Sequence, residues 1–227
     1  EATFENTILA YDDAGQMLAQ TELVFGMLCA AETNDRMQAL QEQAMPLLAA
    51  HRDKIRLDDK LFVRVKEVYD RRAALGLDAE QMRLLQKTYD SFVRAGALLD
   101  AEQKARLKEI NGQLSLTAVK FGNNILAENN NFVLELKSDE LDGLPAGIRD
   151  AAREKARQMG KGDKWVFTLH KPSLIPLLTY STKRDLREKI YKAYLNRCNN
   201  GDEYDNKQLI NDFIRLRTEK AHLLGYP

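Results

Sequence analysis

The chain has few of the residues around which compact chemical sites are usually built. Its 227 residues include two cysteines, three histidines and one tryptophan. Cys29 and Cys198 lie far apart, without CxxC spacing or a neighbouring histidine, so we expect two buried thiols rather than a disulfide or a metal pair. His51, His170 and His222 are also scattered, and we interpret them as surface or capping residues rather than ligands.

The sequence also lacks the signals of a membrane or nucleic-acid protein. No window approaches the roughly 18 uncharged apolar residues that a bilayer span requires, and no basic segment followed by an apolar one opens the chain. The 34 basic residues balance the 34 acidic residues, so no global field attracts nucleic acid or an anionic membrane. We therefore expect a soluble protein without these two partners, and we favour the cytoplasm over the periplasm or export. Because the chain starts with Glu1 rather than Met, we expect that something upstream was removed.

No self-sufficient catalytic motif is found in the sequence. A zinc hydrolase helix needs two histidines four residues apart with a glutamate between them, and this HExxH pattern is absent. No GxSxG elbow exists, and the turn 160–162 follows a predicted helix, whose C-terminal carbonyls repel phosphate. Carboxylate pairs such as Asp58 with Asp59 are interpreted as helix starts or solvated surface. We therefore predict no catalytic residue, no metal ligand and no cofactor in this chain, which alone is not expected to be an enzyme.

Helical periodicity extends over most of the sequence. Hydrophobic residues make up 44% of the chain, which is enough for a substantial core. Apolar spacings of three and four predict one long helix over residues 4–28, and Pro46 is expected to break or kink the next apolar stretch. Asp58 then predicts the N-terminus of a helix that ends at Gly76.

Two further helices are predicted to pair as an antiparallel hairpin. Asp78 with Gln81, and Asp100 with Gln103, are capping arrangements that each begin a helix. Both helices carry long apolar stripes, and Gly96 on the seam would permit close approach of the backbones.

A small β element is predicted after these helices. Asparagines 129–131 end the second helix, and residues 132–137 then alternate between apolar and polar side chains. A second apolar run covers residues 165–169, and between the two runs Pro145 begins a helix that continues to Gly160. The two runs are therefore expected to pair as short antiparallel strands.

The predicted fold class is mainly α, multihelical, with long antiparallel helix hairpins and a small two-stranded antiparallel β element. We predict that residues 1–131 form N-terminal long-helix hairpins. Residues 132–227 are predicted to contain the β pair and the helices that follow, in one continuous structural unit with the first part. The last predicted helix, residues 206–224, carries apolar residues on more than one side, as expected for a helix between two layers.

Several short motifs follow one another in the C-terminal part of the chain. They are Pro172-Ser173, Tyr180-Ser181, the Arg-x-Leu-Arg-Glu run from Arg184 to Glu188, Tyr194, Arg197, Asp205-Asn206, Leu216-Arg217 and Leu224-Gly225-Tyr226. In this order they resemble the region that precedes the catalytic domain in the thimet-oligopeptidase family of zinc metallopeptidases, and the peptidyl-dipeptidase branch fits best. Residues 92–126 and 140–145 also resemble that family.

The resemblance implies that this chain is a truncated N-terminal region without the catalytic zinc domain. In that family the HExxH helix and a further glutamate lie downstream of the Leu-Gly-Tyr run, so zinc belongs to the parent enzyme. The implied role is a helical wall around a channel that limits substrates to short peptides. The implied partners are the C-terminal catalytic domain of the same polypeptide and short peptide substrates.

Five residues match the family at positions that could line the channel or a domain interface. They are Tyr180, Arg184, Arg187, Arg197 and Arg217. A purely structural interpretation is also open, in which the arginines form ion pairs and carbonyl caps and the tyrosine is packed. Two other interpretations of the whole chain remain open: a stand-alone helical module that binds a partner helix, and a degenerate family member that ends naturally at Pro227.

Overall fold

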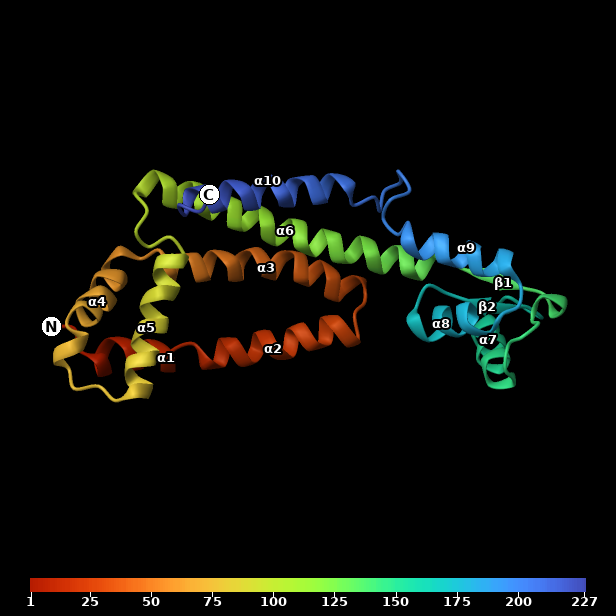
Figure 1. The fold of residues 1–227 in the computed structure, drawn as a ribbon, viewed down its shortest axis with the longest axis horizontal. Coiled ribbons are helices and arrows are strands. Elements are labelled where there is room, and N and C mark those ends of the chain that lie inside the picture. The colour runs from red at the N-terminus through yellow and green to blue at the C-terminus, as the bar shows by residue number, and fades with distance from the viewer. The chain divides into compact units, whose positions relative to one another are not determined.

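The computed structural model describes all residues from Glu1 to Pro227 (Figure 1). The chain is mainly helical with one two-stranded antiparallel sheet, which confirms the predicted fold class. Packing groups the residues into two units: a helical unit, residues 1–119 and 212–227, and an α/β unit, residues 120–211. The predicted division after residue 131 stays a prediction. No helix combines the length and the apolar composition that a bilayer crossing requires.

The helical unit begins with three short segments instead of one long helix. A π-helical segment, Phe4–Leu9, leads into α1 (Ala10–Asp13), and α2 (Gln16–Ala31) follows. The long helix predicted over residues 4–28 is therefore wrong. The break lies at Gly15, whose φ of 82° places the backbone in the left-handed region that glycine adopts without a steric penalty.

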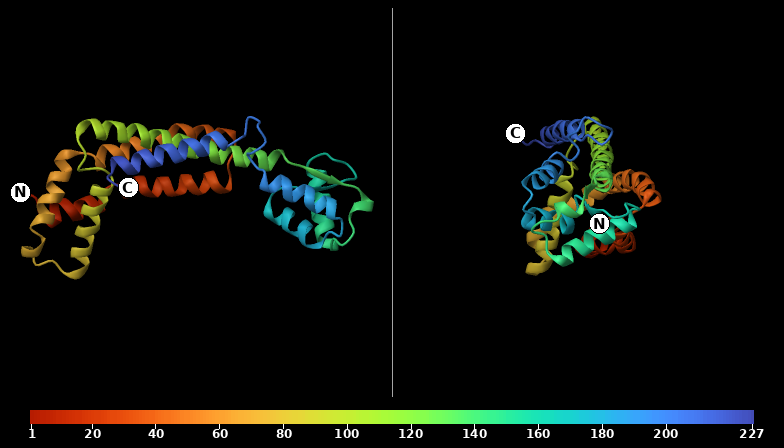
Figure 2. Two further views of the ribbon diagram at one scale, coloured as in Figure 1. Left: turned by 45° about the horizontal axis from the view of Figure 1, so that its top comes forward. Right: turned by 90° about the vertical axis from the view of Figure 1, so that its right-hand side faces the viewer.

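Helices α2 and α3 (Asp35–Arg56) form a long antiparallel hairpin, which is also visible in Figure 2. The Asn34 side chain accepts a backbone N–H of the first turn of α3, and Arg52 forms an ion pair with Glu22 of α2 at 2.5 Å. Pro46 lies inside α3, so the helix is not broken there. A proline inside a helix removes one backbone hydrogen bond, and α3 continues through Pro46 to Arg56.

Helix α4 (Asp59–Asp70) begins where it was predicted, because the Asp58 carboxylate accepts the Leu61 N–H at 2.7 Å. The helix ends before the predicted Gly76. A 3₁₀ segment, Arg72–Ala74, follows it and tightens the chain toward the next helix.

Helix α5 (Ala79–Arg94) begins at the predicted capping box, where Asp78 and Gln81 exchange hydrogen bonds. It packs chiefly against α4 and the N-terminal segment, not against the following helix as predicted. Close approach after α5 is nevertheless observed, because a Cβ atom on Gly96 would lie 2.7 Å from Leu107 Cδ2.

The core of the helical unit lies among the N-terminal segment, α4 and α5. The Phe92 ring is fully buried, with centroid distances of 5.3 Å to Tyr11 and 6.1 Å to Phe62. Tyr69 of α4 and Tyr89 of α5 stack with their ring centroids 3.9 Å apart. Other buried apolar residues in this core are Ala2, Phe4, Ile8, Val65, Val68, Leu85 and Ala97.

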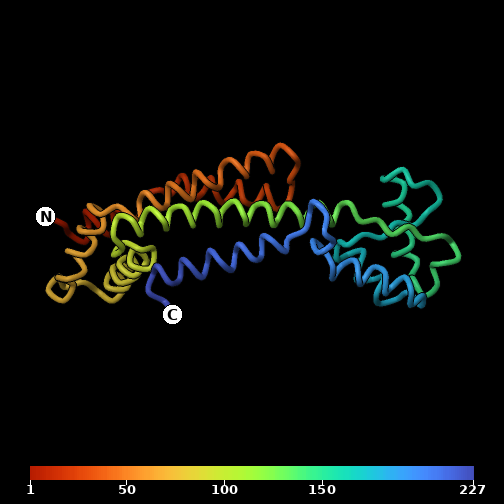
Figure 3. Tube along the Cα trace, turned by 90° about the horizontal axis from the view of Figure 1, so that it is seen from above, coloured from red at the N-terminus to blue at the C-terminus, as the bar shows by residue number.

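The helical unit also contains the first part of α6 (Ala101–Asn131) and the last part of α10 (Lys207–Leu223), which lie side by side (Figure 3). As predicted, Asp100 and Gln103 exchange hydrogen bonds at the start of α6. The Arg106 guanidinium binds both carboxylate oxygens of Glu219, at 2.5 and 2.9 Å. This two-point contact fixes the register of the two helices.

The α/β unit is built around the predicted strand pair. Strand β1 (Leu134–Leu136) pairs antiparallel with β2 (Trp165–Phe167), so that Leu134 lies opposite Phe167. Helix α6 ends at Asn131, as predicted, and α7 (Ala146–Gln158) begins directly after Pro145, also as predicted. Helix α7 packs against β2.

Two helices complete the core of the α/β unit. They are α8 (Lys171–Tyr180) and α9 (Arg184–Leu195), which pack against each other. The buried apolar residues of this core are Leu134, Leu136, Leu141, Leu144, Ala152, Phe167, Leu169, Leu174, Leu177, Leu186 and Ile190. The core draws on both strands and on three helices, so the strand pair is held by side-chain packing as well as by its ladder.

Candidate functional sites

The five residues predicted from the resemblance are distributed over both units. Arg217 lies on the part of α10 that belongs to the helical unit, where its guanidinium carbon is 5.3 Å from the centroid of the Phe213 ring. Tyr180, at the end of α8, is 49% exposed. The remaining three arginines lie on or just after α9.

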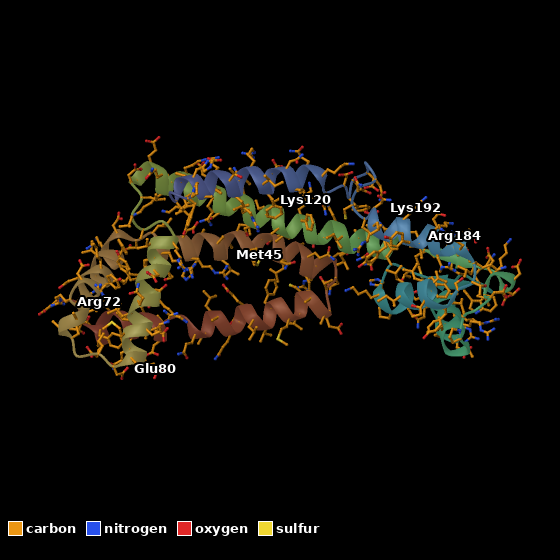
Figure 4. All side chains as sticks on the ribbon, viewed as in Figure 1. Met45, Arg72, Glu80, Lys120, Arg184 and Lys192 are labelled. Carbon is orange, nitrogen blue, oxygen red and sulfur yellow. The ribbon has the colours of Figure 1, made fainter.

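Arg184 and Arg187 line one open cleft of about 410 Å³ on α8 and α9. The other lining residues are Leu178, Glu188, Tyr191 and Lys192, and Figure 4 labels Arg184 and Lys192 on α9. Arg187 Nη1 donates to the carbonyl oxygen of Ser181, the C-cap residue of α8. This hydrogen bond joins α9 to the end of α8. Glu188 and Lys192, one helical turn apart on α9, form an ion pair at 2.5 Å, and the lysine hydrogen bond lowers the pKa of Glu188.

Arg197 is held by contacts on both sides of the loop after α9. Its Nε donates to the carbonyl oxygen of Tyr194 at 2.9 Å, and its Nη1 donates to Asn129 Oδ1 at 3.1 Å. The guanidinium carbon also lies 3.8 Å from the centroid of the Tyr194 ring, a cation–π geometry. These contacts tie the end of α9 to the end of α6 within the α/β unit.

The two cysteine thiols are free and differ in burial. Cys198 is buried, and its N–H donates to the Glu128 carboxylate. Burial, and then the neighbouring Glu128, raise the pKa of the Cys198 thiol to about 11, so it carries little thiolate at neutral pH. The prediction of two buried thiols is wrong for Cys29, which is partly exposed because α2 has no buried residue.

Asp205 organises the loop that leads into α10. Its Oδ2 accepts the Gly201 N–H at 2.8 Å, and its Oδ1 accepts the Lys207 N–H at 2.9 Å. The Lys207 ammonium also lies 2.8 Å from Oδ2. These bonds, led by that from the Lys207 side chain, lower the pKa of Asp205 to about 2.

The depressed pKa of Asp205 predicts a pH-dependent contribution to stability. An unfolded aspartate titrates near 3.9, so the stabilisation is complete above about pH 4 and is lost as the pH falls through about 2. Asp205→Asn is therefore expected to lower the Tm at pH 7 and to lower it progressively less in more acid buffer, as followed by circular dichroism. Glu203→Gln, an exposed change in the same loop, is the control. An equal loss of Tm across the whole pH range would contradict the titration of Asp205.

An unpredicted basic cleft of about 630 Å³ lies within the helical unit. Its lining residues are Asp53, Arg56, Arg83, Lys87, Asp90, Ser91, Arg94, Ala95, Asn111 and Lys220. Arg83, Lys87 and Arg94 are four and seven residues apart, so they lie on one face of α5. This spacing is the only feature of the local sequence that indicates a basic surface. The other cations come from α3 and α10, and no short motif links them.

A hydrogen-bonded network crosses one wall of the basic cleft. Asn111 Nδ2 donates to both carboxylate oxygens of Asp53, at 2.9 and 3.1 Å, and Lys220 Nζ donates to Asn111 Oδ1 at 2.7 Å. Burial raises the pKa of Asp53 and lowers the pKa of Lys220, because each loses water around its charged form. The amide of Asn111 therefore separates the two charges while it orients both.

The helical hairpin of α2 and α3 exposes large apolar side chains. Met17 is 83% exposed, and Leu47 of α3 is 71% exposed. Other exposed apolar residues of the hairpin are Leu18, Leu23, Val24, Met27, Leu28 and Leu40. Large apolar side chains left exposed in this number are candidates for burial by a partner.

No three His, Cys, Asp or Glu side chains converge in an arrangement that could hold a metal ion.

Comparison with known proteins identifies the relatives of the chain. Residues 177–227 match peptidase family M3. Over 225 residues, 99% of the chain, the sequence is 36% identical to dipeptidyl carboxypeptidase of Escherichia coli (strain K12) and covers 33% of that protein. It is 35% identical to dipeptidyl carboxypeptidase of Salmonella typhimurium over 99% of the chain and 33% of that protein. It is 27% identical to oligopeptidase A of Haemophilus influenzae over 99% of the chain and 34% of that protein.

The chain thus spans about a third of the length of the relatives that it matches. That third is their N-terminal part. The resemblance found in the sequence is therefore confirmed: over nearly its whole length the chain is similar to the N-terminal third of dipeptidyl carboxypeptidase and oligopeptidase A, and its residues 177–227 match peptidase family M3.

Proposed function

We propose that this chain forms the noncatalytic wall of the substrate channel in a zinc-dependent peptidyl-dipeptidase or oligopeptidase that hydrolyses short peptides. The observation that carries the proposal is the similarity to dipeptidyl carboxypeptidase over almost the whole chain. Long helices suit this role because they are rigid and can exclude folded proteins by steric hindrance while short peptides pass.

The zinc ion and the general base are assigned to the catalytic part of the polypeptide, not to this chain. The absence of three converging ligand side chains supports that assignment. What this chain would supply is shape and contact surface, not groups that take part in bond cleavage.

The exposed apolar side chains of the α2–α3 hairpin support the presence of a partner that covers this hairpin. Removing apolar surface from water stabilises a complex by roughly 25 cal/mol per Å², and Met17, Leu23 and Leu47 are each exposed by more than half. We assign the catalytic part of the same polypeptide as that partner. Tyr180, Arg184, Arg187, Arg197 and Arg217 remain proposed channel or interface positions, and the exposed Tyr180 and the open cleft beside Arg184 support this assignment.

The gene downstream of the Pro227 codon tests the proposal directly. We expect an HExxH sequence and a further glutamate there. The complete gene product is expected to release C-terminal dipeptides from N-blocked short peptides, as measured by chromatography. A zinc chelator should abolish the release, and zinc should restore it.

A folded protein of unrelated sequence serves as the control substrate and should remain uncleaved. A stop codon at this position, with no HExxH sequence in the gene, would overturn the proposal. It would favour the helical interaction module, whose hairpin face would then bind a separate protein.

A further inference from the structure

The basic cleft of the helical unit concentrates positive charge in a chain whose net charge is zero. Five cationic side chains line it against the two carboxylates of Asp53 and Asp90, an excess of three positive charges. The cations are Arg56, Arg83, Lys87, Arg94 and Lys220. Because the whole chain carries a formal net charge of zero, this excess is a local feature of the cleft.

Both carboxylates in the cleft are already bound by neutral amides. Asp53 accepts two hydrogen bonds from Asn111. Asp90 accepts a hydrogen bond from Gln86 Nε2 at 2.9 Å. The two carboxylates therefore accept hydrogen bonds from amides rather than from the arginines and lysines of the cleft. N–H groups of these cations remain available to bind an anion.

The three cations of α5 have no acidic partner within 4.0 Å. Arg83, Lys87 and Arg94 form none of the ion pairs of the structure. Elsewhere in the same unit, cations do find acids, as Arg52 does with Glu22. The spacing of four and seven residues places all three on one face of α5, the face that lines the cleft.

The opposite wall of the cleft presents a positioned ammonium group. Lys220 is half-buried, and its Nζ is oriented by the hydrogen bond to Asn111 Oδ1. Partial desolvation makes a positive charge costly in isolation, and an anion bound nearby would offset that cost. Arg56 at the end of α3 adds a second cation from outside α5.

The lining also restricts the chemistry of the ligand. Ala95 is its only apolar residue, and no aromatic side chain is present on which a nucleobase could stack. Guanidinium groups bind phosphate oxygens in pairs, and lysines bind them as point charges. A volume of about 630 Å³ falls within the usual range for small-molecule sites.

We propose that this cleft binds a small, charge-dense polyphosphate anion of the pyrophosphate or tripolyphosphate class. Arg83, Lys87 and Arg94 contact it from α5, and Arg56 and Lys220 contact it from the other wall. The proposal goes beyond the peptidase function, because binding is a property of this chain and needs no catalytic zinc domain.

Isothermal titration calorimetry of the 227-residue chain with tripolyphosphate tests the proposal. Saturable binding to one site is expected, and it should weaken as salt is added because the interaction is electrostatic. Arg83→Gln with Arg94→Gln removes two cations from the cleft and is expected to raise the Kd by about tenfold or more. A tenfold change in Kd corresponds to about 1.4 kcal/mol of binding free energy. Far-UV circular dichroism establishes that the variant remains folded.

The matched control removes the same charge from outside the cleft. Lys54→Gln with Lys60→Gln changes two exposed lysines of the same unit that do not line the cleft, and it should leave the Kd nearly unchanged. An equal loss of affinity in both variants would overturn the site, since general charge would then explain the binding. Absence of saturable binding would also overturn it, and would leave the peptidase assay of the complete gene product unaffected.

Two further ligands test the chemical class. ATP should bind no more tightly than tripolyphosphate, because the lining offers its base no aromatic surface. A glutamate-rich hexapeptide should bind more weakly than tripolyphosphate, because its charges are less dense. Tighter binding of either ligand would overturn the polyphosphate assignment.

Discussion

Replacing Gly143 with alanine is expected to destabilise the α/β unit by about 2–5 kcal/mol, from backbone strain and overpacking together. Its φ of 83° lies in the left-handed region. A Cβ atom would lie 2.1 Å from the carbonyl oxygen of Tyr180 and 3.0 Å from the backbone nitrogen of Thr182. These are backbone atoms, so no change of side-chain rotamer can relieve the clash.

The surroundings of Gly143 leave the chain little room to adjust. Thr182 N–H donates to the carbonyl oxygen of Asp142 at 3.0 Å, which joins the α8–α9 junction to the loop before α7. Leu141 and Leu144, on either side, are both buried in the core of the unit. Moving the loop to accept a methyl group would break this hydrogen bond or withdraw the leucines from the core.

Urea unfolding followed by the fluorescence of Trp165 measures the effect of Gly143→Ala. Trp165 is the only tryptophan and lies on β2, so its emission reports on the α/β unit. Gly147→Ala is the matched control, because no atom lies within 4 Å of the added methyl group and the residue is in α7. The control is expected to stabilise the unit by about 0.5–1 kcal/mol. Equal stability of the two variants would show that the close approach at Gly143 is not formed.

The sequence predicted best those features that depend on hydrogen bonds over a few residues. Asp58 and Asp78 cap helices where expected, since each carboxylate accepts an N–H three residues ahead. Pro145 precedes α7 for a similarly local reason, because its fixed φ suits a helix start. Alternation in residues 132–137 also identified a strand whose two leucines are buried.

Except for the pairing of the two strands, the breaks and partners of the long helices were predicted less well. The apolar period of residues 4–28 continues across Gly15, and only the backbone conformation there reveals the break. Pro46 was expected to interrupt a helix that in fact continues as half of a hairpin. The predicted partner of α5 was also wrong, because α5 packs chiefly against α4 and the N-terminal segment.

The candidate sites show the same limit of local reasoning. The resemblance identified arginines near α9, and their contacts in the α/β unit became visible only in the structure. The basic cleft could not be found from motifs, because Asp53, Asn111 and Lys220 come from three different helices far apart in sequence. Charge balance over the whole chain also concealed it.

Phe92→Ala is expected to destabilise the helical unit by about 3–5 kcal/mol, the usual cost of removing a buried aromatic ring. The ring of Phe92 is fully buried, and it contacts Tyr11 of α1 and Phe62 of α4. It therefore joins the N-terminal segment to both helices of the core. Loss of the ring leaves a cavity, and the cavity adds to the cost of the lost apolar burial.

Urea unfolding followed by far-UV circular dichroism measures the loss, because the unit is helical throughout. Val63→Ala on α4 is the control, since Val63 is 62% exposed and its truncation should change stability by no more than about 0.5 kcal/mol. Phe92→Leu should fall between the two, because leucine fills part of the cavity. If Phe92→Ala and Val63→Ala cost the same, Phe92 does not join the N-terminal segment to α4 and α5, and the core of the helical unit must lie elsewhere.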